Sequence, residues 1–283
     1  MDNFWANVLT NVVANWINLS IVAIISIFLL FYINLSKRKK LFKLLGLYRR
    51  SEIKPNIEIY VSTIRVLKNG ALFSDGTRAV NFESITVGAA EVFELTTLEK
   101  IFEPGILKYV PTQIKNKLIK WNIAFTEINP DFQPSPTDLS QIKNNNIILL
   151  GGPDFNAATR AYLNKNEAIM RFLPKATRSK PYVEILCGNS KGQVVSPHKE
   201  KMDLAIIQKQ TMKEDDRVIL ILAGNGSNGT RAAIKYFAKH WEELYKRYQE
   251  RDFSLCLQCE ERELNPQGYE SWNVIRTIPE EPL

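Results

Sequence analysis

The sequence has few of the residues that most often carry catalysis, metal binding or covalent cross-linking. It holds three cysteines and two histidines among 283 residues. Three cysteines are too few for the disulfide framework of a small secreted protein, and they are typical of a reducing compartment. The chain also contains no G-x-S-x-G or H-E-x-x-H motif and no paired-carboxylate pattern. These absences argue against a disulfide scaffold and against the common hydrolase classes.

The cysteines and histidines that are present do not form a recognisable site. Cys256 and Cys259 make one C-x-x-C pair in an apolar segment, and no second pair accompanies them. Residues three apart on a strand face opposite sides, so the pair predicts core packing rather than zinc binding. His198 and His240 have no evident partner in the sequence. We therefore expect no metal ion, no resident cofactor and no catalytic residue.

Charge is unevenly distributed along the chain. Of the net charge of +7, residues 1–50 supply +6, through seven basic residues against one acid. Residues 51–283 then hold 30 basic and 29 acidic residues, so they are nearly neutral. A basic surface spread over the main domain, as in many nucleic-acid-binding proteins, is therefore not indicated.

No charged residue occurs between Asn3 and Ser36, a stretch longer than the roughly 20 apolar residues that span a bilayer. The stretch ends at KRKK, residues 37–40, and the positive-inside rule places this basic flank in the cytoplasm. A basic n-region and a cleavage site, which a signal peptide needs, are missing. We predict a single transmembrane helix with its N-terminus outside. We expect three parts. Residues 1–36 form an amphipathic and transmembrane helix, and residues 37–55 form a basic juxtamembrane segment on anionic lipid. Residues 56–283 form a cytoplasmic domain.

Asparagine recurs at nearly every helical turn in the first half of this segment, at Asn3, Asn7, Asn11, Asn15 and Asn18. At about 100° per residue the five lie within an arc of roughly 120°, so they form a one-sided stripe. Three readings stay open: a helix lying in the outer interface, a helix–helix seam, or a pore lining. The last two require a homo-oligomer, because a lone helix offers no partner for amides at membrane depth. In the pore reading, the lining residues are Asn7, Asn11, Asn15 and Asn18.

Residues 56–283 alternate between strand-like and helix-like segments. The apolar runs 147–150 and 218–222 are each followed by glycines and then by helical spacing, over 156–163 and 231–248. Two such units predict an α/β fold with a doubly wound, mostly parallel, Rossmann-like sheet. Helical spacing also occurs over 80–102.

Both glycine-rich loops are expected beyond the carboxyl ends of their strands, where open α/β sheets bind ligands. The second loop matches G-x-G-x-x-G, in which glycines let the backbone approach a phosphate at a helix N-terminus. The alternative is a tight turn without a ligand, or for the first loop a capped helix with a surface arginine. The candidate ligand-binding residues are Gly151, Gly152, Pro153, Asn156, Thr159 and Arg160 in the first loop. In the second loop they are Gly224, Asn225, Gly226, Ser227, Asn228, Gly229, Thr230 and Arg231.

The stretch AGNGSNGTRAA resembles the glycine loop of the SLOG/LOG-like Rossmannoid superfamily, whose enzymes carry a G-G-x-G-T-x-x-E pattern. Gly229 and Thr230 match the G-T of that pattern, whereas Asn225 to Asn228 replace the double glycine and Ala233 takes the glutamate position. The resemblance implies nucleotide binding. Because the acid needed for N-glycosidic hydrolysis is missing, we expect binding without catalysis.

The whole arrangement also resembles membrane-anchored effectors of bacterial anti-phage systems of the CBASS, Pycsar and Hailong types. That resemblance implies a homo-oligomeric channel or membrane-disrupting protein, for example a tetramer, in the bacterial inner membrane. It also implies control by a nucleotide or a short single-stranded DNA, with a nucleotidyltransferase supplying the ligand. The alternative function is a membrane-tethered nucleotide-processing enzyme in which the helix is only an anchor.

Overall fold

The protein is described here from a computed structural model. Its described residues are 2–46, 57–61, 63–65, 71–72, 78–79, 85–87, 97–98, 101, 131–134, 146–154, 156–164, 168–173, 182–198, 202–213, 217–260 and 272–279. The chain divides into two compact units. Met1–Lys40 and Glu103–Phe125 form the first, and Leu41–Phe102 and Thr126–Leu283 form the second.

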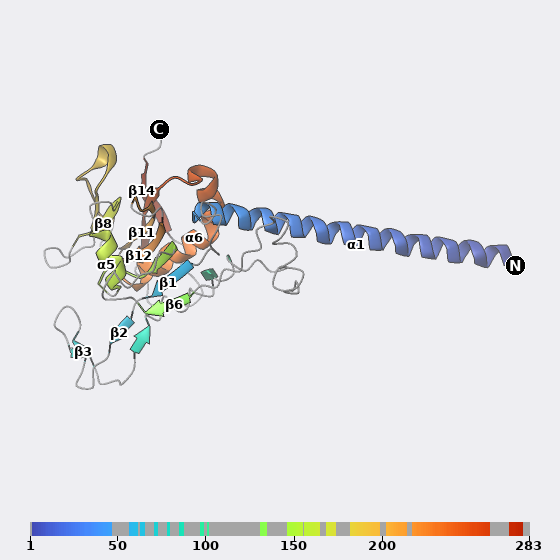
Figure 1. The fold of residues 1–283 in the computed structure, drawn as a ribbon, viewed down its shortest axis with the longest axis horizontal. Coiled ribbons are helices and arrows are strands. Elements are labelled where there is room, and N and C mark those ends of the chain that lie inside the picture. The colour runs from blue at the N-terminus through green and yellow to red at the C-terminus, as the bar shows by residue number, and fades with distance from the viewer. Residues whose placement is uncertain are drawn as a thin grey trace. The chain divides into compact units, whose positions relative to one another are not determined.

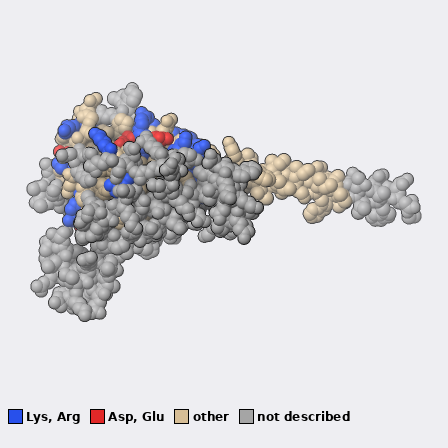
Figure 2. Space-filling model, viewed as in Figure 1, with Lys and Arg blue, Asp and Glu red and all other residues tan. Residues whose placement is uncertain are grey.

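The described part of the first unit is a single helix, α1 (Asp2–Leu44), whose last turn belongs to the second unit. Within it, the 33 residues Val12–Leu44 contain an apolar stretch that is long enough to cross a membrane. At about 1.5 Å per residue they exceed the hydrocarbon thickness of roughly 30 Å. Exposed apolar side chains cover it from Val12 to Ile33, and Figure 2 shows this part of the helix without charged residues. The prediction of an N-terminal apolar helix is thus confirmed.

The asparagine stripe lies on this continuous helix. Asn15 and Asn18 are exposed. The side chains of Asn3, Asn7 and Asn11 lie outside the described residues. The role of the stripe therefore stays a prediction.

The second unit contains a seven-stranded sheet in the order β14-β13-β11-β12-β7-β1-β6. Strands β6, β1, β7 and β12 are mutually parallel, whereas β11 is antiparallel to both β12 and β13, and β14 is antiparallel to β13. The bounds are β1 (Ile57–Val61), β6 (Asp131–Pro134), β7 (Asn146–Leu150), β11 (Met202–Thr211), β12 (Val218–Gly224), β13 (Phe253–Glu260) and β14 (Trp272–Ile278). The domain is therefore mixed α/β, with a sheet that is parallel on one side and antiparallel on the other.

The antiparallel half differs from the predicted mostly parallel sheet. β11 and β12 are joined by the short connection 212–217, and Met212 N donates to Arg217 O at 2.8 Å to close the hairpin. A connection this short can join only antiparallel strands. β11 thus lies between β12 and β13, which are themselves linked by helix α6 (Ser227–Tyr248) and point the same way.

Both faces of the sheet are covered (Figure 1). On one face, alternate residues such as Ile147, Leu149 and Ile221 form a core with Tyr162 of helix α5 (Ala157–Leu163). A small antiparallel sheet of β8 (Met170–Phe172), β9 (Val183–Ile185) and β10 (Val194–Val195) joins this core, and the 3₁₀ turn η3 (Gly188–Ser190) follows β9. α6 packs against β12, β11 and β13 from the other face.

The remaining strands form two small two-stranded sheets. β2 (Thr63–Arg65) pairs with β5 (Ile85–Val87), and β3 (Ala71–Leu72) pairs with β4 (Arg78–Ala79). The helical interpretation of 80–102 is wrong at β5, where the β-branched run Ile-Thr-Val favours a strand.

The end of α1 is built into the sheet domain. Leu41, Phe42, Leu44 and Leu45 are at most 2% exposed. This corrects the expectation that these apolar residues lie on lipid, because they instead contribute to the interior of the second unit. The basic residues between them had suggested a membrane surface, but the apolar positions of an amphipathic helix serve a protein core equally well.

Candidate functional site

The two glycine loops lie side by side. β7 and β12 pair in parallel with Leu150 opposite Leu222, and Gly151 N donates to Leu222 O at 3.1 Å. The approach is close enough that a Cβ atom on Gly152 would stand 2.1 Å from Gly224 O. Only glycine fits there. The structure therefore brings together the two loops that the sequence analysis singled out, at the carboxyl edge of the parallel strands.

In the first loop, Asn156 joins three elements. Its side chain is fully buried, accepts a hydrogen bond from Thr159 N at 2.9 Å and donates to Leu150 O at 2.8 Å and Tyr60 O at 3.3 Å. It thus caps α5 and ties that helix to the ends of β7 and β1. These bonds occupy the amide as a structural group.

Arg160 also serves its own loop. Its guanidinium donates from Nε to Pro153 O at 2.7 Å and from Nη2 to Asp154 O at 3.0 Å. Among the described residues, the buried hydroxyl of Thr159 has no hydrogen-bond partner. Buried polar groups are normally paired, so the Thr159 hydroxyl has unused bonding capacity.

In the second loop, a carboxylate occupies the position that a bound phosphate would take. Gly226 N and Gly229 N donate to Asp203 Oδ2 at 3.0 and 2.8 Å. Asp203 Oδ1 accepts from Leu204 N at 2.8 Å, and the residue is 7% exposed. The N-terminus of α6 favours a negative charge, and here the protein supplies that charge itself.

Asp203 was missed by the sequence analysis. It is the single acid in MDLAIIQKQ, near the start of the apolar strand β11. An isolated acid in a buried strand is a usable pattern, because such a group is almost always paired when buried. Which donors it would meet depends on the antiparallel placement of β11, which the sequence analysis did not predict.

The other residues of the second loop divide by exposure. Thr230 is buried, and its Oγ1 accepts from Gly224 N at 3.1 Å and donates to Gly226 O at 3.2 Å. Arg231 is 8% exposed. Ser227 is exposed, and Asn225 and Asn228 are half-buried. A ligand can therefore reach Asn225 in the loop and Ser227 and Asn228 in the first turn of α6, which begins at Ser227 and not at the expected residue 231.

Ala233, at the position of the glutamate in the SLOG-like pattern, is fully buried on α6. Of the C-x-x-C pair, Cys256 belongs to the same core as Tyr162 of α5, and burial raises the pKa of its thiol to about 12. The Cys259 thiol donates to Asp203 O at 3.7 Å. Neither of these two cysteines is in a disulfide, and both pack as small apolar residues.

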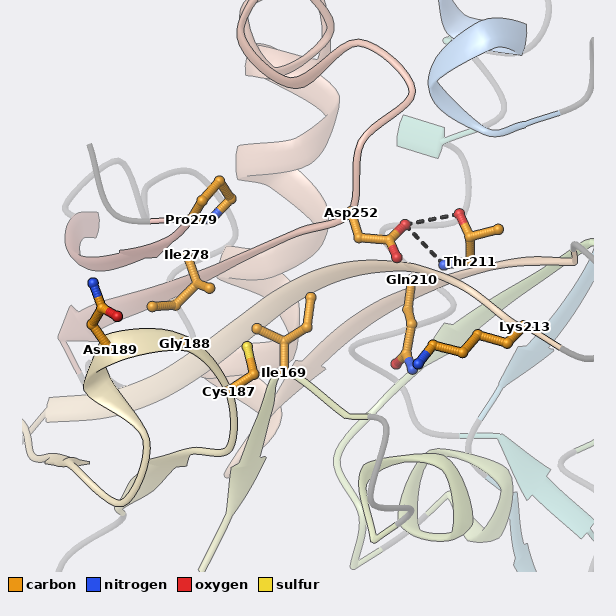
Figure 3. A pocket seen from close by; sticks show the side chains of 10 residues that line it. All are labelled: Ile169, Cys187, Gly188, Asn189, Gln210, Thr211, Lys213, Asp252, Ile278 and Pro279. Atoms are coloured by element: carbon orange, nitrogen blue, oxygen red, sulfur yellow. Dashed lines mark hydrogen bonds between the residues drawn. The ribbon is translucent and has the colours of Figure 1, made fainter. Parts of the chain in front are cut away.

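A separate cavity of about 690 Å³ lies at the other end of β11 (Figure 3). We call it the β11 pocket. Its walls come from Ile169 before β8, from the Cys187–Asn189 turn, from the end of β11, and from Ile278 at the end of β14. Its volume falls within the range of roughly 300–1,000 Å³ that is common for ligand sites.

The charged groups of the β11 pocket are Lys213 and Asp252. Asp252 Oδ1 accepts from Thr211 N at 2.9 Å and from Thr211 Oγ1 at 2.8 Å, and it lies 4.0 Å from the buried Lys209 Nζ. The carboxylate is thus already bonded and faces a nearby cation. Burial raises the pKa of the Cys187 thiol, so at neutral pH this wall carries a neutral thiol.

Neither a protein-family model nor a curated protein matches the sequence. Within the described residues, no group of three or more His, Cys, Asp or Glu side chains is arranged to hold a metal ion. The glycine-loop edge offers amides that Asp203 already occupies, and the β11 pocket offers an apolar cavity with polar ends.

Proposed function

We propose that the protein is a membrane-anchored effector in which α1 spans the bilayer and the α/β domain senses a ligand of the nucleotide class. One observation carries this proposal: the last turn of α1 is part of the domain's core. A simple tether needs only an apolar span and a basic flank, and a flexible link would then suffice. Burial of Leu41, Phe42, Leu44 and Leu45 instead fixes the end of the helix to the sensing domain.

The attachment is made at the amino ends of two central strands. Asn146, the first residue of β7, donates from Nδ2 to Leu45 O at 3.2 Å. Its Oδ1 accepts from Val218 N, the first residue of β12, at 2.9 Å. The same two strands end at the glycine loops. A ligand with different affinities for two arrangements of the sheet can therefore shift the end of α1.

The remaining features of the proposal rest on sequence patterns. The domain is proposed to be Rossmann-like, of the SLOG type, because glycine loops follow β7 and β12. The KRKK flank supports a cytoplasmic domain with the N-terminus outside. The asparagine stripe supports a homo-oligomer whose helices surround a pore, and the architecture supports a role in bacterial anti-phage defence. A nucleotide or short single-stranded DNA is the proposed controlling ligand.

The pore is tested by removing amides from α1. We expect replacement of both Asn15 and Asn18 by leucine to abolish ion flux through the protein reconstituted in liposomes, because a leucine-lined constriction excludes water. The matched control is Ser20→Leu, on the opposite side of the helix, whose hydroxyl donates only within the helix, to Trp16 O at 2.8 Å. Flux that persists unchanged in the double variant would remove the pore from the proposal.

The attachment is tested at Asn146. We expect Asn146→Ala to speed amide hydrogen exchange at residues 41–46 by roughly tenfold or more, since the substitution leaves Leu45 O and Val218 N without their partner and each such loss costs about 1–3 kcal/mol. Hydrogen exchange with mass spectrometry on the full chain measures this. Asn164→Ala, at the exposed end of α5, is the matched control. Equal protection in both variants would show that Asn146 does not hold the helix end.

A further inference from the structure

The β11 pocket lies at the sheet edge opposite the glycine loops. Thr211, in its wall, pairs with Val218, the first residue of β12, whereas Gly224 ends that strand and pairs with Ala205. The pocket is therefore at the amino edge of the parallel strands, the edge at which Asn146 holds the end of α1.

The wall of the pocket has two polar ends and an apolar middle (Figure 3). Asn189 stands at one end, beside Ile278. Ile169 and the neutral thiol of Cys187 form the middle. At the other end, Lys213 extends toward the carboxamide of Gln210. The Asp252 carboxylate accepts two hydrogen bonds from Thr211 and lies 4.0 Å from Lys209 Nζ, so Lys209 balances its charge.

The polar groups of this end are positioned by the core. Gln210 is 8% exposed, and its Oε1 accepts from Gln208 Nε2 at 3.2 Å. Gln208 is fully buried and accepts from Met170 N at 2.8 Å. A chain of amides thus fixes the Gln210 side chain before any ligand arrives. Preorganised polar groups in an apolar cavity are the usual basis of small-molecule selectivity.

We propose that the β11 pocket binds a small anion with a flat, largely apolar body and a hydrogen-bonding edge, of which a purine mononucleotide is the type. The ring system would lie between Ile169 and Ile278, with its polar edge toward the carboxamide of Asn189. The phosphate would lie at Lys213, which acts as a point charge. Carboxamides pair with the edges of purines through one donor and one acceptor. That this site regulates α1 rests on the proposed function, whereas the binding of the ligand does not.

The position of the site connects it to α1. Thr211 ends β11, and the hairpin closed by the bond from Met212 N to Arg217 O leads directly to Val218. Val218 N is bonded to Asn146, which is bonded to Leu45 O. A ligand that shifts Thr211 or Met212 therefore acts on the residues that hold the helix end. The glycine loops lie at the far end of the same strands.

The test is titration calorimetry on the detergent-solubilised full chain with AMP, GMP, adenosine and inorganic phosphate. We expect AMP or GMP to bind, and Lys213→Met to weaken that binding roughly tenfold, the size of one charge-assisted contact. Adenosine, which lacks the phosphate, should bind the native protein and Lys213→Met equally. Lys246→Met, an exposed lysine on α6 outside the pocket, is the matched control and should change affinity less than twofold.

Three results would overturn the inference. The first is no heat with either mononucleotide at millimolar concentration. The second is inorganic phosphate binding as tightly as AMP, which indicates an adventitious ion only. The third is a pair of results: the variant with both Ser227 and Asn228 replaced by alanine loses binding, and Lys213→Met binds normally. This pair would place the ligand at the glycine loops. The third result would contradict binding in the β11 pocket and leave the proposed function intact. Conversely, if AMP or GMP binds in the pocket but does not change ion flux, the pocket is kept and the proposed control of the channel is contradicted.

Discussion

Replacing Gly152 by alanine is expected to lower the free energy of unfolding of the sheet domain by more than about 3 kcal/mol. The new methyl group would stand 2.1 Å from Gly224 O, a backbone atom that cannot rotate away. Relief requires β7 and β12 to separate at their ends, and the bond from Gly151 N to Leu222 O would be strained as well. Denaturant unfolding of the full chain, followed by tryptophan fluorescence, measures the loss.

Gly192→Ala is the matched control for this substitution. Gly192 has a φ of +84°, and a Cβ atom there would meet nothing within 4 Å. The substitution only places an alanine in a left-handed backbone conformation, which lowers the free energy of unfolding by about 1–2 kcal/mol. If Gly152→Ala is no more destabilising than Gly192→Ala, then the two loops do not approach each other as described.

Removing the carboxylate of Asp203 is also expected to lower the free energy of unfolding strongly. Asp203→Ala leaves the amides of Leu204, Gly226 and Gly229 without their acceptor. Buried donors without partners cost about 1–3 kcal/mol each, and water can reach the partly exposed Gly226, so we expect a loss of about 3–5 kcal/mol. The freed amides at the N-terminus of α6 then form an anion site.

That new anion site gives the experiment a specific readout. Phosphate or sulfate should raise the melting temperature of Asp203→Ala more than that of the native protein, at ionic strength matched with chloride. Asp154→Ala, an exposed acid in the neighbouring loop, should change stability by less than about 0.5 kcal/mol and show no such rescue. A melting temperature of Asp203→Ala that does not respond to phosphate would contradict the proposed geometry of the amides.

Much of the fold follows from local pattern. The uncharged run from Asn3 to Ser36 predicts the apolar helix because length and composition alone decide that question. The apolar runs before Gly151 and before Gly224 predict β7 and β12, which are buried on both faces. What pattern cannot supply is strand order. β11 reads as one more buried strand, and its place between β12 and β13 depends on the short hairpin and on tertiary packing.

The candidate site shows the same division. That the loops at Gly152 and Gly224 meet follows from the general rule for parallel strands. Their chemical state does not, because Asp203 reaches the amides only when β11 runs antiparallel beside β12. The β11 pocket was beyond prediction for a related reason. Its walls come from segments far apart in sequence, and neither Asn189 nor Lys213 belongs to a motif.

The carboxylate of Asp203 is an acceptor covalently tethered to the donors it satisfies. A tethered group competes with free ligands at an effective concentration that reaches the millimolar range and above. A diffusing phosphate group must therefore displace the Asp203 carboxylate from these amides. This competition lowers the apparent affinity of the amides for the phosphate group. The G-x-G-x-x-G segment is thus an anion site that the Asp203 carboxylate already fills. A ligand that bound to these amides would leave that negative charge buried and without its donors beside Gly226 and Gly229.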